Sequence, residues 1–262
     1  MGGSILTTNL WKTIREEAQC SSEREPALAS FYYANILNHD SMPAALAFNL
    51  ALRLDSPTLS ASLLRDVCLQ ALLHDADLCA ATERDCAAYY ERDPACDRYS
   101  MPLLYFKGYQ AIQAYRVAHW LWRQGRKSLA LYFQNRVACE FSVDIHPAAR
   151  LGKGIMLDHA TGVVLGETAA IGDDVSMLHG VVLGGSGCGK GQRHPVVGNG
   201  VLLGAGAKLL GNISIGSGSK IASNSVVLCD VPEGTTFAGV PAKLVGKSRV
   251  AQPALAMNQH WN

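Results

Sequence analysis

Apolar residues recur every six positions through the second half of the chain. They stand at Ile145, Leu151, Leu157, Val163, Ala169, Val175 and Val181, and again at Val197, Leu203, Leu209, Ile215, Ile221 and Val227. A period of six fits neither an α-helix nor an amphipathic strand. It is typical of a left-handed parallel β-helix, in which each hexapeptide is a short strand with a turn and three of them close a triangular coil. Glycine often follows the apolar residue, as at Gly204 and Gly216, where we expect it to ease the backbone through the turn.

The repeat is interrupted once. Sixteen positions separate Val181 from Val197 where the period allows six, so we predict ten inserted residues, all within a loop over 184–196. A solenoid accepts insertions at its corners, and loops of this kind often carry function. This loop is rich in glycine and contains Arg193 and His194. We therefore expect it to be a functional arm.

The first half follows a helical period instead. Apolar stripes predict helices at Ala27–Leu37, Ala44–Leu54, Ala61–Leu73, Leu103–Trp122 and Ser128–Cys139, with helix starts at Asp55-Ser56-Pro57 and Ser100-Met101-Pro102. The predicted fold is α+β. It has an all-α domain over residues 1–140, a left-handed β-helix over 141–246, and a short mobile C-terminal tail over 247–262. Phe237–Pro241 is expected to form a closing turn that covers the last coil.

Composition narrows the function. The chain has 262 residues, 17% of them charged, and a net charge of +1, so neither nucleic acid nor an anionic membrane is indicated as a partner. No apolar run approaches the roughly 20 residues of a spanning helix. Eight cysteines are scattered without a Cys-x-x-Cys pair. That usage is typical of reduced thiols and predicts a cytoplasmic protein.

The loop offers two weaker motifs. Gly184-x4-Gly189-Lys190 matches most of a P-loop, but Gly191 stands where a magnesium-binding Ser or Thr belongs, and no helical pattern follows. Cys188 could accept an acyl group, but no sequence context marks it as a nucleophile, which favours an ordinary loop thiol.

His159 lies immediately after an apolar marker, at a corner or on an outward face. Asp144, His179, Arg193 and His194 share the solenoid with it, and we expect these polar groups to gather at one end. Asp144 precedes His159 by fifteen residues, and a coil is eighteen residues long, so the two belong to adjacent coils about 4.8 Å apart. A carboxylate on one imidazole nitrogen would leave the other free as a base. A catalytic dyad and a structural polar pair both fit this spacing.

A shared zinc ion is the rival interpretation of the histidines. His159, His179 and His194 are separated by 20 and 15 residues, and the close His pair that such a site would need is absent. We therefore expect no metal and imidazoles that are available for acid–base work.

Longer segments resemble the serine acetyltransferase family. They are Asp144–Gly162, Leu183–Gly187, Arg193–Pro195, Leu203–Lys208 and Ala238–Ala242, together with Asp93-Pro94, Pro102–Tyr105 and Gln113–Trp122 in the helical half. The hexapeptide period alone would suit many acyltransferases. The Asp-His-Ala-Thr-Gly segment at Asp158–Gly162 together with this helical half is much more specific.

The resemblance implies transfer of an acetyl group from acetyl-CoA, as co-substrate, to L-serine, the first step of cysteine synthesis, with no tightly bound cofactor. His159 would be the base, oriented by Asp144. Asp93 and Asp158 would bind the serine ammonium, and Arg193 and His194 its carboxylate. Acetyl-CoA would lie in a groove between subunits of a trimer, near Gly185, Ala205, Lys220, Ser223 and Lys243.

The resemblance also implies inhibition by L-cysteine, competitive with serine, and a hexamer of two trimers joined through the helical domains. In many members the C-terminal tail ends in Ile and inserts into O-acetylserine sulfhydrylase. This chain departs from that pattern, because it stops at His260-Trp261-Asn262.

Two other functions fit the repeat. A different hexapeptide acyltransferase would act on a sugar, an antibiotic or another amine, and would have no use for paired acids and Arg193. A non-catalytic scaffold would not need a Gly-rich loop that presents Arg193 and His194.

Overall fold

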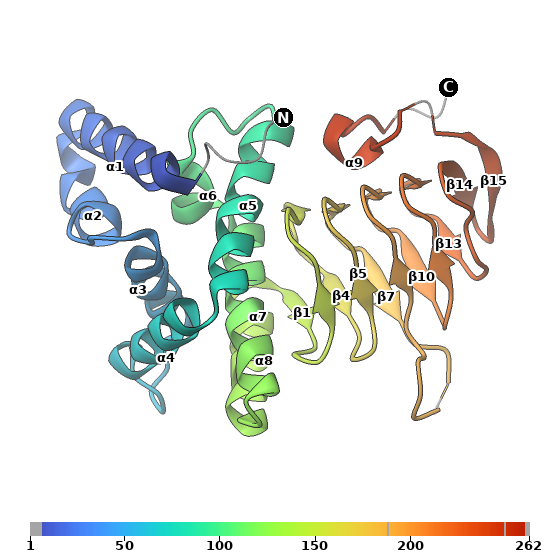
Figure 1. Cartoon of the computed structure of the whole chain (residues 1–262), viewed down its shortest axis with the longest axis horizontal. Helices are drawn as coiled ribbons and strands as arrows, with labels where there is room; N and C mark the ends of the chain where they lie inside the picture. Colours follow the sequence, from blue (N-terminus) through green and yellow to red (C-terminus); the bar gives the residue numbers. More distant parts are fainter. Residues whose placement is uncertain (1–6, 188, 249, 260–262) are drawn as a thin grey trace.

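The apolar stripes of the first half form helices that pack at one end of a solenoid (Figure 1). The computed structural model describes residues 7–187, 189–248 and 250–259. Before the solenoid the described chain forms α1 (Thr7–Arg24), α2 (Ala29–Tyr32), α3 (Met42–Leu54), α4 (Ala61–His74), α5 (Ala76–Arg92), α6 (Ser100–Tyr105), α7 (Lys107–Arg123) and α8 (Lys127–Phe141). A 3-10 turn at Pro26–Leu28 and a π-helical turn at Tyr33–Leu37 flank α2.

Two predicted helix boundaries are wrong. Asp55-Ser56-Pro57 begins no helix, because the Ser56 hydroxyl accepts backbone N–H groups of the local turn that follows, and α4 starts only at Ala61. The predicted helix Leu103–Trp122 is broken at Phe106, whose backbone is extended. The Gln110 side chain donates to the Leu103 carbonyl near this break, which supplies a partner that the interrupted helix lacks.

The second half forms the predicted coils. Its strands are β1 (Val143–Ile145), β2 (Arg150–Leu151), β3 (Met156–Asp158), β4 (Val163–Leu165), β5 (Ala170–Ile171), β6 (Ser176–Leu178), β7 (Val182–Gly184), β8 (Val196–Val197), β9 (Leu202–Leu203), β10 (Lys208–Leu210), β11 (Ser214–Ile215), β12 (Lys220–Ile221), β13 (Val226–Val227), β14 (Thr235–Gly239) and β15 (Ala242–Lys247). They make three sheets, ordered β1-β4-β7-β10-β13, β11-β8-β5-β2 and β15-β14-β12-β9-β6-β3. Successive strands of one sheet come from successive coils, and all pairs except β14–β15 are parallel.

The register shows where extra residues enter. Partner residues of neighbouring coils are twenty positions apart at Val143 and Val163, eighteen apart at Val164 and Val182, and twenty-six apart at Ala170 and Val196. The ten extra residues that we assigned to one loop are therefore divided: eight follow β7, and two widen the corner 159–162. The apolar series conceals this corner because each strand has two inward positions, such as Val163 and Leu165, both buried. A two-residue insertion moves the series from one inward position to the other.

The glycines that follow the apolar markers have a different role from the one expected. Gly204 and Gly216 do not adopt positive φ. A Cβ at Gly204 would lie 2.5 Å from the Ser223 backbone nitrogen, and one at Gly216 would lie 2.3 Å from that of Glu233. Glycine is needed here because the corner of the next coil lies directly against it.

The C-terminal segment closes the solenoid and then folds back over it. β14 continues the sheet beside β12, and β15 turns back antiparallel to it. The short helix α9 (Pro253–Ala256) follows; Ala254 within it is fully buried, and its carbonyl accepts a hydrogen bond from Ser176 at 3.0 Å. The tail that we expected to be mobile is therefore anchored on the solenoid at Pro253 and Ala254, while most of its other described residues are exposed. The end of the tail, residues 260–262, lies outside them.

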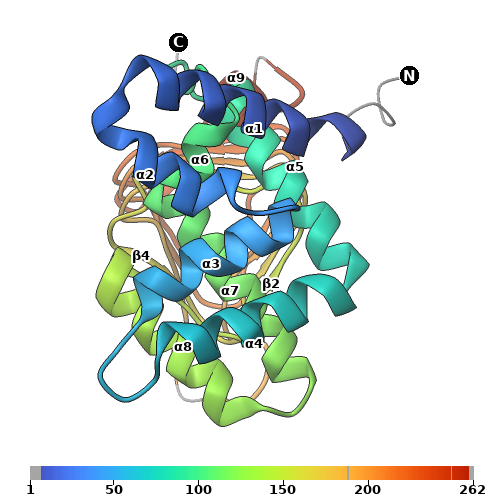
Figure 2. The ribbon, with the colours of Figure 1, turned by 90° about the vertical axis from the view of Figure 1, so that its left-hand side faces the viewer.

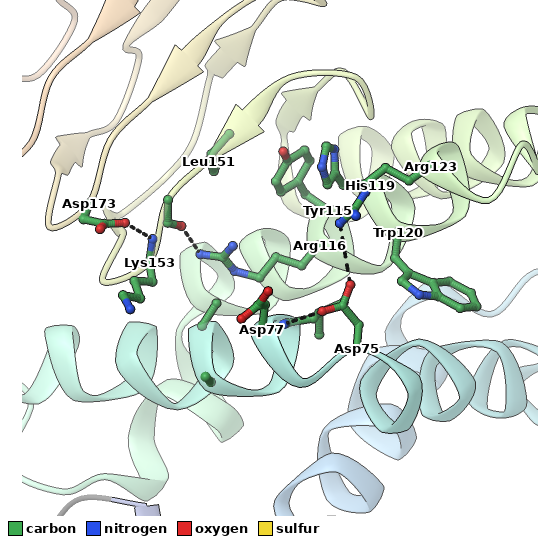
Figure 3. A pocket seen from close by; sticks show the side chains of 14 residues that line it. Asp75, Asp77, Tyr115, Arg116, His119, Trp120, Arg123, Leu151, Lys153 and Asp173 are labelled. Carbon is green, nitrogen blue, oxygen red and sulfur yellow. Dashed lines mark hydrogen bonds and ion pairs between the residues drawn. The ribbon is translucent and has the colours of Figure 1, made fainter. Parts of the chain in front are cut away.

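A buried ion pair between α5 and α7 contacts the first coil through both of its members. Figure 2 shows the helices crossing the end of the solenoid. Between them Asp85, which is fully buried, accepts hydrogen bonds from Arg116 at 2.8 and 3.0 Å and from the Ile155 backbone at 2.9 Å. Arg116 also donates to the Gly152 carbonyl, as Figure 3 shows. These contacts satisfy both charges, and they fix the helices on the solenoid.

Across the described residues, none of the helices is both long and apolar enough to cross a membrane.

Candidate functional site

The widened corner after β3 presents His159. His159 and Ala160 both have left-handed backbones, with φ of 56° and 57°, a conformation that costs about 1–3 kcal/mol for each residue other than glycine. Contacts from outside hold the corner in place: the Gly162 N–H donates to the Ser142 carbonyl at 2.7 Å, and Lys107 donates to the Thr161 hydroxyl. The His159 side chain is 78% exposed.

A pocket of about 280 Å³ opens beside this corner, between the helical domain and the solenoid. Its lining includes three residues that the sequence analysis singled out, Asp93, Asp158 and His159. Asp93 reaches it because α5 ends there, with Asp93 as its C-terminal cap. The helical domain therefore contributes Asp93 to a pocket that the solenoid also lines.

Asp158 is the acid of this pocket that lies nearest His159. Its Oδ1 is 3.8 Å from the His159 Nε2. Burial raises the pKa of the Asp158 carboxyl, and the nearby Asp93 raises it further, while His159 and His179 act in the opposite direction. A cation bound beside Asp158 and Asp93 would stabilise the ionised form of Asp158.

Asp144 has another partner in this chain. Its Oδ1 accepts a hydrogen bond from the Gln134 side chain at 2.7 Å. Its neighbour in the adjacent coil is Val164, two positions past the widened corner, because the insertion shifts the pairing by two residues. Within the described residues no hydrogen bond or ion pair joins Asp144 to His159.

Arg193 and His194 are held on the loop after β7. Arg193 pairs with Glu167 at 2.5 Å, and its hydrogen bond lowers the pKa of the Glu167 carboxyl. His194 is 8% exposed, and its Nδ1 lies 2.8 Å from the Thr168 hydroxyl. Burial, with the nearby Arg193 charge, lowers the pKa of His194. The sequence analysis missed Glu167 and Thr168, since only the coil register places them beside the loop.

The two groups occupy different edges of the triangular prism. The edge between the β3 sheet and the β1 sheet carries His159 and His179, whose rings are 6.2 Å apart; we name it the His159 edge. The edge between the β1 sheet and the β2 sheet carries Arg193 and His194; we name it the Arg193 edge. Within one chain these side chains all lie in the early coils, but they are divided between two edges of the prism.

The candidate CoA residues are also divided between these edges. Ala205 and Ser223 lie at corners further along the His159 edge, and Gly185 opens the loop of the Arg193 edge. Lys220 lies on β12 and Lys243 on β15. The C-terminal tail covers part of this surface: Lys220 donates to the Asn258 carbonyl at 3.4 Å, and Ser223 to the Gln259 side chain at 3.5 Å.

Two alternatives receive no support from the geometry. Among the residues that the structure describes, no three His, Cys, Asp or Glu side chains could hold a metal ion together. Cys188 lies outside the described residues.

A second pocket, of about 400 Å³, lies where α5 and α7 meet the first coils (Figure 3). It contains both acidic and basic side chains, among them Asp75 paired with Arg123 at 3.7 Å. None of the site residues predicted from the sequence lines it. We therefore centre the site on the pocket beside His159.

Comparison with known proteins matches both halves. The family model for the serine acetyltransferase N-terminal region matches residues 10–114, and that for the bacterial transferase hexapeptide (six repeats) matches 194–229. The serine acetyltransferase of Salmonella typhimurium is 53% identical over 253 residues, which cover 97% of this chain and 93% of that protein.

Solved structures agree. The serine acetyltransferase of Vibrio cholerae has a TM-score of 0.95 and 55% identity, covering 97% of this chain and 98% of its own. A serine acetyltransferase in complex with cysteine has a TM-score of 0.95 and 50% identity, covering 97% and 98%. The enzyme of Brucella abortus in complex with coenzyme A has a TM-score of 0.89 and 50% identity, covering 91% and 96%.

Proposed function

The chain belongs to the serine acetyltransferase family, and from this premise we propose that the His159 corner is the catalytic part of its active site. The protein is an acetyl-CoA-dependent acyltransferase, which transfers the acetyl group to the hydroxyl of L-serine and yields O-acetyl-L-serine and CoA. The observation that carries the residue assignment is the pocket in which Asp93, Asp158 and His159 meet.

His159 is the general base of this proposal. It removes the proton of the serine hydroxyl as that oxygen attacks the thioester carbonyl, and the resulting imidazolium then protonates the departing CoA thiolate. A base in this role contributes about 10²–10⁴-fold to the rate. The His159 ring is exposed, and the corner that carries it is held by the hydrogen bond from Gly162 to Ser142. Both features suit a base that must contact serine and acetyl-CoA.

The charges of L-serine are divided between the two groups of residues. Asp93 and Asp158 bind the ammonium, whose positive charge stabilises the half-buried Asp158 carboxylate beside Asp93. Arg193 and His194 bind the carboxylate, for which the planar guanidinium is well shaped. Because these two residues lie on the other edge of the prism, they come from a neighbouring copy of the chain.

A trimer with threefold symmetry provides this arrangement. In such a ring the His159 edge of each chain faces the Arg193 edge of the next, so three equivalent sites form between subunits. Leu52, Leu63 and Leu73 on α3 and α4 are at least half exposed. This apolar surface supports the further proposal that two trimers join through their helical domains.

Acetyl-CoA lies along the groove between the two edges. Ala205 and Ser223 line it from one chain, with Lys220 and Lys243 towards the nucleotide, and an amide near Gly185 of the neighbouring chain stabilises the oxyanion. The tail residues that contact Lys220 and Ser223 have to leave before CoA can reach those side chains.

Four finer points from the sequence remain proposals. Asp144 orients His159, as the family resemblance implies, which requires the Asp144 carboxylate to turn from the Gln134 side chain that it contacts here. L-Cysteine binds in the serine subsite and competes with serine, in keeping with the relative that was captured with cysteine. The reaction takes place in the cytoplasm, in keeping with the free thiols of all the cysteines that the structure describes. Docking on O-acetylserine sulfhydrylase depends on residues 260–262, outside the described part.

Release of CoA thiol from acetyl-CoA, measured with and without L-serine, tests the assignment. We expect release to depend on serine in the wild type and to fall by about a hundredfold or more in His159→Ala, as loss of a general base requires. Release without serine dependence would contradict the substrate. Full activity in His159→Ala would contradict the base.

A further inference from the structure

The residue that precedes Asp158 and His159 is bonded to the helical domain through one hydroxyl group. The Tyr89 hydroxyl accepts a hydrogen bond from the Leu157 N–H and donates one to the Leu157 carbonyl, both at 3.0 Å. Tyr89 is 2% exposed and Leu157 is fully buried. Because β3 is the edge strand of its sheet, a single side chain here takes the place of a further strand.

Two aromatic rings and helix α7 pack closely around Tyr89 and hold its side chain in place. Its ring lies 5.8 Å from that of Phe106 and 6.0 Å, edge to face, from that of Tyr109. Helix α7 presses against the same point, since a Cβ at Gly108 would lie 2.1 Å from the Leu157 oxygen and 2.8 Å from the Tyr89 hydroxyl. The end of β3 is thus held between α5 and α7 at a single position.

We propose that Tyr89 is a positioning residue for the acyl transfer, which acts by fixing Leu157 and thereby the corner that presents His159. The inference rests on the proposed role of His159 as the base. Two residues past Leu157 the backbone enters its left-handed stretch at His159 and Ala160. Such a conformation persists only where the surroundings impose it, and Tyr89 imposes it on the strand side of the corner.

A second tyrosine provides a matched control. Tyr115, on α7, is 3% exposed and donates its hydroxyl to the Ala149 carbonyl of the same first coil. Ala149 lies at the corner between β1 and β2, on a different edge from His159. Tyr89→Phe and Tyr115→Phe therefore both remove a buried hydroxyl that joins the helical domain to the first coil. Only Tyr89→Phe releases the strand that leads into the base.

The test is the kcat of Tyr89→Phe and Tyr115→Phe, each made in the wild type and in His159→Ala, at saturating serine and acetyl-CoA. Thermal unfolding of each full-length variant is followed in parallel. Because a misplacement of about 1 Å can cost about 100-fold in rate, we expect Tyr89→Phe to lower kcat by about tenfold or more. In His159→Ala the same substitution should change kcat by less than about twofold, since the group that it positions is gone. Tyr115→Phe should lower the unfolding temperature yet keep kcat within about twofold.

Three results would overturn the proposal. One is a kcat within twofold of wild type in Tyr89→Phe while His159→Ala is impaired, which would leave the base assignment intact. Another is an equal loss from Tyr89→Phe in both backgrounds, which would show that the hydroxyl acts on stability and independently of His159. The third is unimpaired kcat in His159→Ala, which would remove the base and the positioning role together.

Discussion

Mixed oligomers should recover activity that neither of two damaged chains has alone. The His159 edge supplies the base and the acids, and the Arg193 edge supplies the carboxylate-binding pair, and one chain cannot bring these edges together. His159→Ala and Arg193→Ala chains, co-expressed in equal amounts, would therefore assemble some sites with an intact corner from one chain and an intact loop from the next.

The size of the recovery follows from the geometry. A site is intact when the chain that supplies the corner is the Arg193→Ala chain and the neighbour that supplies the loop is the His159→Ala chain. Each condition holds for half of the positions in a random ring, so about one quarter of the sites are intact. The joining of two trimers into a hexamer leaves this fraction unchanged, because each site lies within one ring.

The assay is CoA thiol release per mole of chain. The serine concentration is kept well below the KM, so that weaker serine binding in Arg193→Ala lowers the measured rate. A matched control combines His159→Ala with Asp158→Ala. Both residues lie on the same corner of the same chain, so no mixture of these two chains contains an intact site. Activity of the first mixture no higher than the mean of its parents, or recovery in the control mixture, would refute a site that is shared between edges.

The buried charges make two further predictions. Asp85→Asn leaves Arg116 buried without its counter-charge, so the free energy of unfolding measured in urea should fall by about 3–5 kcal/mol. Asp66→Asn, in an exposed ion pair, should change that free energy by less than about 1 kcal/mol. Equal losses in the two variants would contradict the argument. Burial raises the pKa of the Cys68 thiol to about 12, which disfavours the reactive thiolate. Iodoacetamide at pH 8 should therefore label the exposed Cys229 but not Cys68 until the protein unfolds, and mass spectrometry of the labelled protein measures both.

Several features were predictable from local patterns. The six-residue repeat is visible because the interior of a narrow prism admits only apolar or small side chains, so inward positions such as Val175 and Leu209 are constrained wherever the coil passes. The helical stripes are visible for the same reason. Asp158 and His159 could be singled out because they are adjacent polar residues directly after an inward Leu157, where a strand has to end.

The tertiary structure alone decided which of these residues share a site. Two extra residues lie at the His159 corner and eight lie in the loop. The six-residue apolar series shows them as a single gap of ten, because each strand has two inward positions and the series passes from one to the other at the corner. That division sets which residues of neighbouring coils are paired, such as Asp144 with Val164. The contacts of Tyr89 with Leu157 and of Asp85 with Ile155 join residues that are 68 and 70 positions apart. No local period encodes such pairs, since a buried hydroxyl or carboxylate acquires its partner only when the helical domain packs against the first coil.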